Sequence, residues 1–157
     1  MIPLLLLLAL QSADRLPPAN PLPYADPAAA AVMAPIDAMF RGLAARDGAA
    51  ILAQVRPEGG ATVATETPDG TRTIRRMSWQ DFAAGVKPGT DRLAERLTDA
   101  VVEVDGDIAM VWGPYTFTVN GKPHHCGVDH FDLIREQGMW KVLNVTWSQR
   151  MTGCPAA

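Results

Sequence analysis

The sequence predicts an α+β domain in which a strongly bent, mostly antiparallel sheet wraps around about three N-terminal helices. Two observations predict this class. Apolar side chains recur at helical spacing through the Ala-rich segment 28–47. The C-terminal part of the chain consists of β-rich segments joined by short Gly-containing turns, which is the pattern of an antiparallel meander. Long strands in one sheet coil and one face has to be covered, so we expect the helices on the concave face.

Local signals predict each element that precedes the meander. Asp26 is a predicted N-cap, because its carboxylate suits the free amides of a helix start and Pro27 suits the first helical position. Ser78 is the equivalent signal for a later helix. Pro68-Asp69-Gly70 predicts a turn between two strands. The predicted elements are helices over 28–47 and 49–55, strands over 61–66 and 71–77, and a helix over 79–85.

The turns of the meander are the strongest local signals in the chain. Asp105-Gly106 and Asn120-Gly121 are typical of two-residue hairpin turns, because both central positions of such a turn need positive φ. Gln137-Gly138 is a weaker signal of the same kind. The predicted β-rich segments are 93–104, 107–119, 122–136 and 139–152.

Two segments precede the predicted domain. Residues 1–13 hold the apolar run Leu4–Leu10 followed by small residues, which predicts a secretory signal peptide; a mis-assigned start or a disordered hydrophobic end is the alternative. The run is too short for a membrane span, which needs about 20 residues. Residues 14–27 are rich in proline and predict an extended leader. We expect a single domain over 28–157 in a periplasmic or secreted protein.

Composition excludes several classes of function. The chain carries 14 basic and 17 acidic residues, a net charge of −3 at pH 7, and its basic residues are scattered. A nucleic-acid-binding surface is therefore not expected. No Gly-rich phosphate loop follows a strand, and no nucleophile elbow occurs. We predict no cofactor.

The two-residue turns fix which residues face one another, and so they predict one face of the sheet. Trp112 is expected opposite Asp129, and Asp129 opposite Thr146. One end of this face is apolar, while the other combines polar and aromatic side chains, which is typical of a ligand pocket; a solvated rim of the sheet is the alternative. A bulge beside Pro114 would bring Tyr115 onto this face. The candidate ligand-binding residues are Trp112, Tyr115, Phe131, Asn144, Thr146 and Arg150.

The opposite face of the predicted sheet is unusually apolar for a solvated surface. We expect this convex face to be covered by a second copy of the chain, as a homodimer. Its apolar members in the predicted register are Val111, Phe117, Val128, Leu143, Val145 and Trp147.

Asp129 and His125 are the candidate catalytic residues. A cavity-facing Asp129 beside Trp112 is desolvated, which raises its pKa and suits a general base. His125 titrates near neutral pH and lies about 13 Å along the strand at roughly 3.3 Å per residue, too far for a direct dyad. Arg150, opposite His125, suits an anionic group. The alternatives are a structural Asp129 that accepts hydrogen bonds and a surface pair of His125 with Arg150.

The cluster of His124, His125, Asp129 and His130 invites a test for metal binding. Neighbouring strand residues point to opposite faces, so we expect His124 and His125 to diverge. His124 and His130 share a face but lie roughly 20 Å apart along the strand. No three of these groups then hold one ion, and we predict no metal site.

The segment 102–155 resembles a known superfamily. The matching pieces are DGDIAMVW, PYTF, NGK, HCGVDHFDL, GMWKVLNVTW and the closing TGC. They resemble exported bacterial members of the nuclear transport factor 2-like superfamily, and within it the SnoaL-like and lumazine-binding-type proteins. The resemblance implies a cone fold, in which a bent sheet and three helices enclose a hydrophobic cavity. The superfamily includes ketosteroid isomerase and scytalone dehydratase as well as pocket proteins without an activity, so it assigns no catalytic residue here.

The same resemblance, with the predicted export, implies a disulfide between Cys126 and Cys154. The register places Cys126 opposite Gln149, about 16 Å from a Cys154 on a straight strand, whereas a disulfide needs Cα atoms roughly 6 Å apart. The chain therefore has to fold back after Arg150, and Gly153 permits that turn.

Three functional hypotheses follow. The first is an exported protein that binds a small, largely apolar molecule in a hydrophobic cavity with a polar rim. The second is a cofactor-independent isomerase, dehydratase or cyclase with Asp129 as general base and His125 or Tyr115 as electrophilic partner. The third is an interaction module whose cavity is closed by side chains. An open cavity favours the first two.

Overall fold

The computed structural model describes Leu22 and residues 26–155. The predicted signal peptide over 1–13 and most of the predicted leader over 14–27 lie outside the described residues. Within them, two helices precede two strands, a third helix and then five strands. The structure is therefore α+β in the predicted element order.

Side chains cap the first amides of each helix. Asp26 accepts from the amide of Ala28 over 2.7 Å, and Pro27 takes the first helical position. Ser78 accepts from the amide of Asp81 over 3.1 Å. Both predicted caps are confirmed. The helices are α1 (Pro27–Ala45), α2 (Gly48–Leu52) and α3 (Trp79–Gly85).

The strands follow the predicted segments with three differences. The first strand begins at Val55, six residues before its predicted start and at the end of the segment predicted as a helix over 49–55. The segment predicted over 93–104 is two strands, because Asp99 has a φ of 49° and breaks the edge. The next turn is Gly106-Asp107, since Asp105 already pairs with Ile108. The strands are β1 (Val55–Glu66), β2 (Arg72–Ser78), β3 (Leu93–Leu97), β4 (Val101–Asp105), β5 (Ile108–Val119), β6 (Lys122–Glu136) and β7 (Met139–Arg150).

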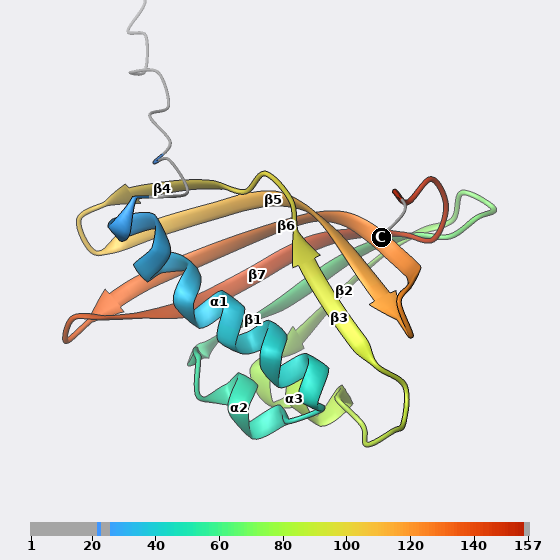
Figure 1. The fold of residues 1–157 in the computed structure, drawn as a ribbon, viewed down its shortest axis with the longest axis horizontal. Helices are drawn as coiled ribbons and strands as arrows, with labels where there is room; N and C mark the ends of the chain where they lie inside the picture. The colour runs from blue at the N-terminus through green and yellow to red at the C-terminus, as the bar shows by residue number, and fades with distance from the viewer. Residues whose placement is uncertain (1–21, 23–25, 156–157) are drawn as a thin grey trace, which may run out of the picture.

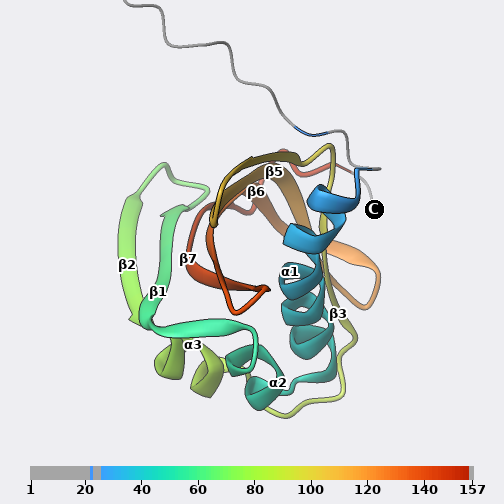
Figure 2. The same cartoon turned by 90° about the vertical axis from the view of Figure 1, so that its left-hand side faces the viewer.

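All seven strands join one sheet in the order β2-β1-β7-β6-β5-β3, with β4 also paired to β5. The β1–β7 pair is parallel and the other pairs are antiparallel. Helix α1 crosses the concave side of this sheet, with α2 and α3 near one end (Figure 1). In the turned view the sheet curves around an interior that α1 closes (Figure 2). This is the bent sheet wrapped on helices that the sequence predicts.

The hydrophobic core lies between α1 and the concave face. Val32 and Ile36 of α1 are fully buried, as are Val111 of β5 and Val142 of β7. Burial of such side chains stabilises the fold by about 1.5–3 kcal/mol each. Among the described helices, α1 alone is long and apolar enough to pass a test for a membrane span. Its buried side packs on the sheet, as in the core helix of a globular protein.

Candidate functional site

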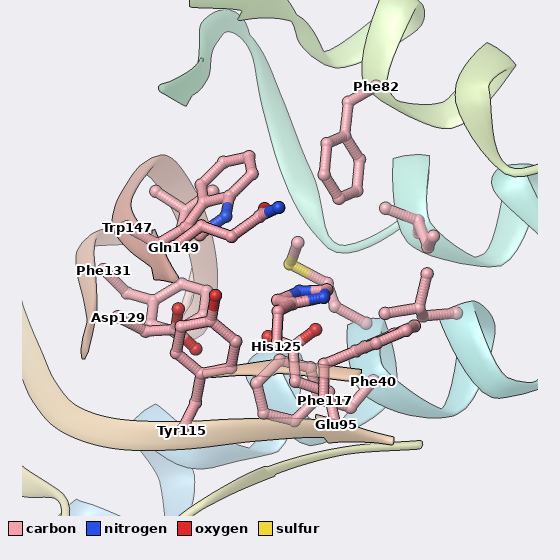
Figure 3. Close-up of a pocket in the computed structure, with 14 residues that line it drawn as sticks. Phe40, Phe82, Glu95, Tyr115, Phe117, His125, Asp129, Phe131, Trp147 and Gln149 are labelled. Atoms are coloured by element: carbon pink, nitrogen blue, oxygen red, sulfur yellow. The ribbon is translucent and has the colours of Figure 1, made fainter. Parts of the chain in front are cut away.

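A cavity of about 210 Å³ lies between α1, α2, α3 and the concave face of the sheet. Its volume is below the roughly 300–1,000 Å³ typical of drug-sized ligands, so it suits a smaller molecule. Most of its wall is apolar or aromatic, with a few polar groups on one side (Figure 3). The lining residues are Met39, Phe40, Leu43, Ile51, Phe82, Glu95, Tyr115, Phe117, His125, Asp129, Phe131, Val145, Trp147 and Gln149.

A β-bulge at His124 determines which β5 side chains line this cavity. Thr118 pairs with Pro123, as the two-residue turn predicts, but the next β5 residue, Phe117, pairs with His125. His124 is therefore an extra residue on β6. From this point on, each β5 residue meets a partner one position away from the predicted one. A shift by one residue turns the whole side-chain set of a strand to the other face.

A second bulge, at Leu143, shifts the pairing of β7 with β6 by one residue. Leu133 pairs with Val142 as predicted, but Asp132 pairs with Asn144. The bulged Leu143 carbonyl accepts from the buried indole Nε1 of Trp79 over 3.0 Å. The bulge therefore has a specific partner on α3, and beyond it Val145 and Trp147 face the cavity.

Because of the two bulges, three of the predicted ligand-binding residues lie outside the cavity lining, which corrects their predicted positions. Trp112 is 50% exposed on the convex face, with its ring 5.7 Å from that of His130. Asn144 accepts from the amide of Gly60 through its Oδ1 over 3.2 Å and so connects β7 to β1. Thr146 is exposed and pairs with His130 in the ladder.

The bulges also change which residues lie on the convex face, so the predicted composition of that face is wrong. Val111, Phe117, Val145 and Trp147 lie on the concave side, in the core or around the cavity. The exposed apolar side chains of β5 on the convex face are instead Ile108 and Trp112.

The other predicted residues, Tyr115, His125, Asp129 and Phe131, line the cavity together. Asp129 is 2% exposed, and its Oδ2 has no hydrogen-bond partner among the described residues. Glu95, the half-buried carboxyl group of β3, lines the same cavity and was not among the predicted residues. Its signal was present, because Leu93, Glu95 and Leu97 alternate on one face of a short strand.

Glu95 and Asp129 form a coupled carboxyl pair. Burial raises the pKa of Glu95 to about 7, while a hydrogen bond with Asp129 opposes that rise. Burial, and then the charge of Glu95, raise the pKa of Asp129 well above its usual range. Both pKa values are raised, so burial favours the protonated form of each carboxyl group. The pair therefore holds a proton near neutral pH, and titrates as a unit.

Tyr115 lies beside the pair on β5. Its hydroxyl donates to the backbone carbonyl of Ser148 over 3.1 Å. Burial first, and then the negative charges of Asp129 and Glu95, raise the pKa of Tyr115. The phenol therefore stays protonated at physiological pH and can act as a hydrogen-bond donor but not as a base.

His125 is neutral at physiological pH. Burial lowers its pKa to about 4, with a smaller contribution from His124. Its ring stacks on Phe117 with centroids 4.6 Å apart. The expectation that His124 and His125 diverge is wrong, because the bulge brings their Nδ1 atoms to 2.9 Å. Among the described residues, no group of three His, Cys, Asp or Glu side chains is arranged to hold a metal ion.

An outer groove adjoins the cavity. Phe40, Glu95 and Tyr115 line both spaces and so form the wall between them. Arg150 lines the groove and not the cavity, which corrects its predicted place in the pocket. A pairing of Cys126 with Arg150 ends the β6–β7 ladder at this groove.

Cys126 and Cys154 are joined by a disulfide with Cα atoms 5.5 Å apart. Cys126 lies opposite Arg150 rather than Gln149, because of the bulge at Leu143. The chain folds back after Arg150, and Gly153 has a φ of 66°. Gly153 therefore supplies the backbone conformation that the turn requires.

Comparisons with known proteins agree with this architecture. Residues 27–148 match the family described as "Putative lumazine-binding". A comparison with curated proteins gave no match.

Several solved structures share the fold. A protein of unknown function from Mycobacterium tuberculosis is 20% identical, with a TM-score of 0.59, over 78% of this chain and 71% of that chain. An NTF2-like protein of unknown function from Pseudomonas putida is 19% identical, with a TM-score of 0.59, over 77% of this chain and 87% of that chain. A structure from Novosphingobium aromaticivorans named "Putative Scytalone Dehydratase" is 11% identical, with a TM-score of 0.60, over 83% of this chain and 91% of that chain.

Identities this low establish a shared fold and carry no activity across. The family match spans the helices, nearly all of the cavity lining and nearly all of the sheet. The chain therefore belongs to the family described as "Putative lumazine-binding", and it shares its fold with solved structures described as NTF2-like.

Proposed function

We propose that this protein binds a small, largely apolar molecule in the cavity between α1 and the sheet. One observation carries the proposal: a 2% exposed carboxyl group, Asp129, lines an aromatic cavity with an oxygen that has no protein partner. An unpartnered buried polar atom costs roughly 1–3 kcal/mol, and a bound ligand can supply the missing partner. The open cavity also disfavours an interaction module whose interior is closed by side chains.

Neighbouring residues of β7 give a matched test of this proposal. Val145 lines the cavity, whereas the next residue, Thr146, is exposed on the convex face. Indole serves as a small neutral probe, and the NMR signal of the Trp147 indole N–H reports its binding. We expect Val145→Phe to fill the cavity and weaken indole binding at least tenfold, while Thr146→Phe leaves it unchanged. Equal binding by both variants, or none by the parent, would contradict the proposal.

A second candidate function is acid–base catalysis without a cofactor. The observation that favours it is the carboxyl pair, because Glu95 with a pKa of about 7 is close to the operating pH of an ideal general acid or base. Asp129 would accept a proton from a bound substrate, and the Tyr115 hydroxyl would turn from the Ser148 carbonyl to donate a hydrogen bond to the charge that develops. An isomerase or dehydratase would fit these roles. Turnover abolished by Asp129→Asn, with retained binding, would separate this function from binding alone.

We also propose a homodimer through the convex face of the sheet. Ile108 and Trp112 are 60% and 50% exposed there, on alternate positions of β5. Exposed apolar groups of this size favour association. Light scattering after size-exclusion chromatography tests the proposal, with Trp112→Asp expected to shift a dimer to a monomer. A monomeric parent protein would refute it.

Export is the last part of the proposed function. The disulfide between Cys126 and Cys154 supports an oxidising compartment, where such bonds persist. The apolar run over 4–10 supports a signal peptide. Fractionation of cells that express the full chain, with mass spectrometry of the mature N-terminus, tests both. A cytoplasmic protein that retains residues 1–13 would overturn the proposal.

A further inference from the structure

The ionisable groups of the cavity lining carry either negative charge or no charge at neutral pH. Its lining contains two carboxyl groups, Glu95 and Asp129, and no Lys or Arg side chain. His125 does not compensate, since its low pKa keeps the imidazole neutral. Besides Glu95, the charged side chains of the outer groove are Asp37, Arg96, Asp99 and Arg150. The cavity therefore has a negative or neutral interior and no internal counter-charge.

The rest of the wall is made of aromatic faces and edges. Phe40 and Phe131 meet edge to face with centroids 6.1 Å apart, and Phe82 and Trp147 do so at 6.2 Å. The labelled rings surround the same space into which the carboxyl groups point (Figure 3). An aromatic ring presents a negative face, which attracts a cation within about 6 Å of the ring centre.

Asp129 supplies an independent indication of a ligand. It is 2% exposed, lines the cavity, and leaves Oδ2 without a donor among the described residues. A buried carboxylate in this position is stabilised only by a proton or by an opposite charge that enters the cavity. A proton stabilises this carboxyl group when no ligand is bound, and a cation can take the place of that proton.

Resting on the proposed ligand-binding function, we propose that the cavity selects a small molecule with a cationic nitrogen, which the Glu95–Asp129 pair neutralises and the surrounding aromatic rings enclose. The ligand class is a small quaternary ammonium or protonated amine with an apolar body. A carboxylate ligand is excluded, because it would add a third acidic group to a space without a basic side chain.

The proposal makes binding depend on pH in a defined direction. The carboxyl pair faces Tyr115 of β5 and His125 of β6, which are both neutral between pH 5.5 and 8. A permanent cation binds best when the pair has lost its proton. Since the pKa of Glu95 is about 7, we expect the affinity for such a cation to fall roughly tenfold between pH 8 and pH 5.5.

Choline and 3,3-dimethyl-1-butanol form the matched pair of probes, because they share a shape and differ in one fixed positive charge. Binding to the full chain is followed by NMR at pH 8, with the Trp147 indole N–H as a reporter within the cavity. We expect choline to bind at least tenfold more tightly than the alcohol. Glu95→Gln and Asp129→Asn should each reduce this preference to less than threefold. Asp37→Asn, in the adjoining groove, is the control and should retain it.

The outcomes separate this inference from the proposed function. If the alcohol binds and choline shows no preference, or if choline binding strengthens at pH 5.5, cation selection is overturned while the binding cavity stands. If neither probe nor indole perturbs the cavity, the proposed function and the inference both fail. The comparison between the two pH values uses the parent protein alone, so it does not depend on the folding of a variant.

Discussion

Glu95→Gln should change how the stability of the protein depends on pH. In the parent the folded state raises the pKa of Glu95 from 4.5 to about 7, because burial disfavours its charge. The folded protein therefore holds this proton more tightly than the unfolded chain does. The stabilisation is complete below about pH 4.5 and is lost as the pH rises through about 7. Glutamine does not titrate, so the variant lacks this loss.

The magnitude follows from the size of the pKa change. At about 1.4 kcal/mol for each tenfold change in proton affinity, the upper limit is about 3 kcal/mol. Glu95 is half-buried, so solvent screening reduces this to about 1–2 kcal/mol. In a domain of this size, the variant should gain roughly 3–6 °C in melting temperature relative to the parent between pH 4.5 and pH 8.

The difference between the two proteins is the quantity to measure. His125 acts in the opposite direction, because its folded pKa of about 4 makes stability rise with pH up to about 6.5. In the parent alone these effects oppose each other, whereas both proteins contain His125, so the difference between them removes its contribution. Thermal unfolding is followed by circular dichroism at pH 4.5, 6 and 8, with Glu103→Gln on β4 as a control. Parallel profiles for the parent and Glu95→Gln would refute the reasoning.

Three further changes test the packing of the sheet. Phe131→Ala removes a ring that is 2% exposed and should reduce the free energy of unfolding by about 3–5 kcal/mol in urea titrations. Gly127→Ala would place a Cβ 1.9 Å from the Ser148 carbonyl oxygen, and the yield of folded protein should drop sharply. Replacing both Cys126 and Cys154 with Ser opens a loop with a sequence separation of 28 and should cost about 3–4 kcal/mol in the same titrations. A disulfide-free variant as stable as the parent would contradict the last expectation.

Local chemistry made the elements of the fold predictable. The caps Asp26 and Ser78 and the turn at Asn120-Gly121 act through neighbouring residues, so the sequence pattern identifies them without knowledge of the tertiary structure. The candidate site was only partly predictable. Residues Tyr115, His125, Asp129 and Phe131 lie around the cavity as expected, yet Trp112, Asn144 and Thr146 do not.

The errors have a single physical source. A two-residue turn fixes the register only as far as the first bulge, and a bulge depends on contacts from distant segments. At Leu143 the displaced carbonyl is satisfied by Trp79, which is 64 positions away in the sequence. The partner that stabilises the bulge is therefore invisible in the hairpin itself. Glu95 was missed for a related reason, because it meets Asp129 only after the edge strand pairs with β5.

The two bulges also explain why the site is located where it is. In the predicted register, Asp129 would share its face with Trp112, Asn144 and Thr146, and those polar neighbours would offer it hydrogen bonds. The bulges at His124 and Leu143 replace them with Tyr115, Val145 and Trp147. The Tyr115 hydroxyl donates its hydrogen bond to a backbone carbonyl instead, and neither Val145 nor Trp147 donates one to Asp129 Oδ2. The bulges that make the actual register differ from the predicted one thus also leave a desolvated carboxyl group in the cavity. That group gives the cavity its proposed chemistry.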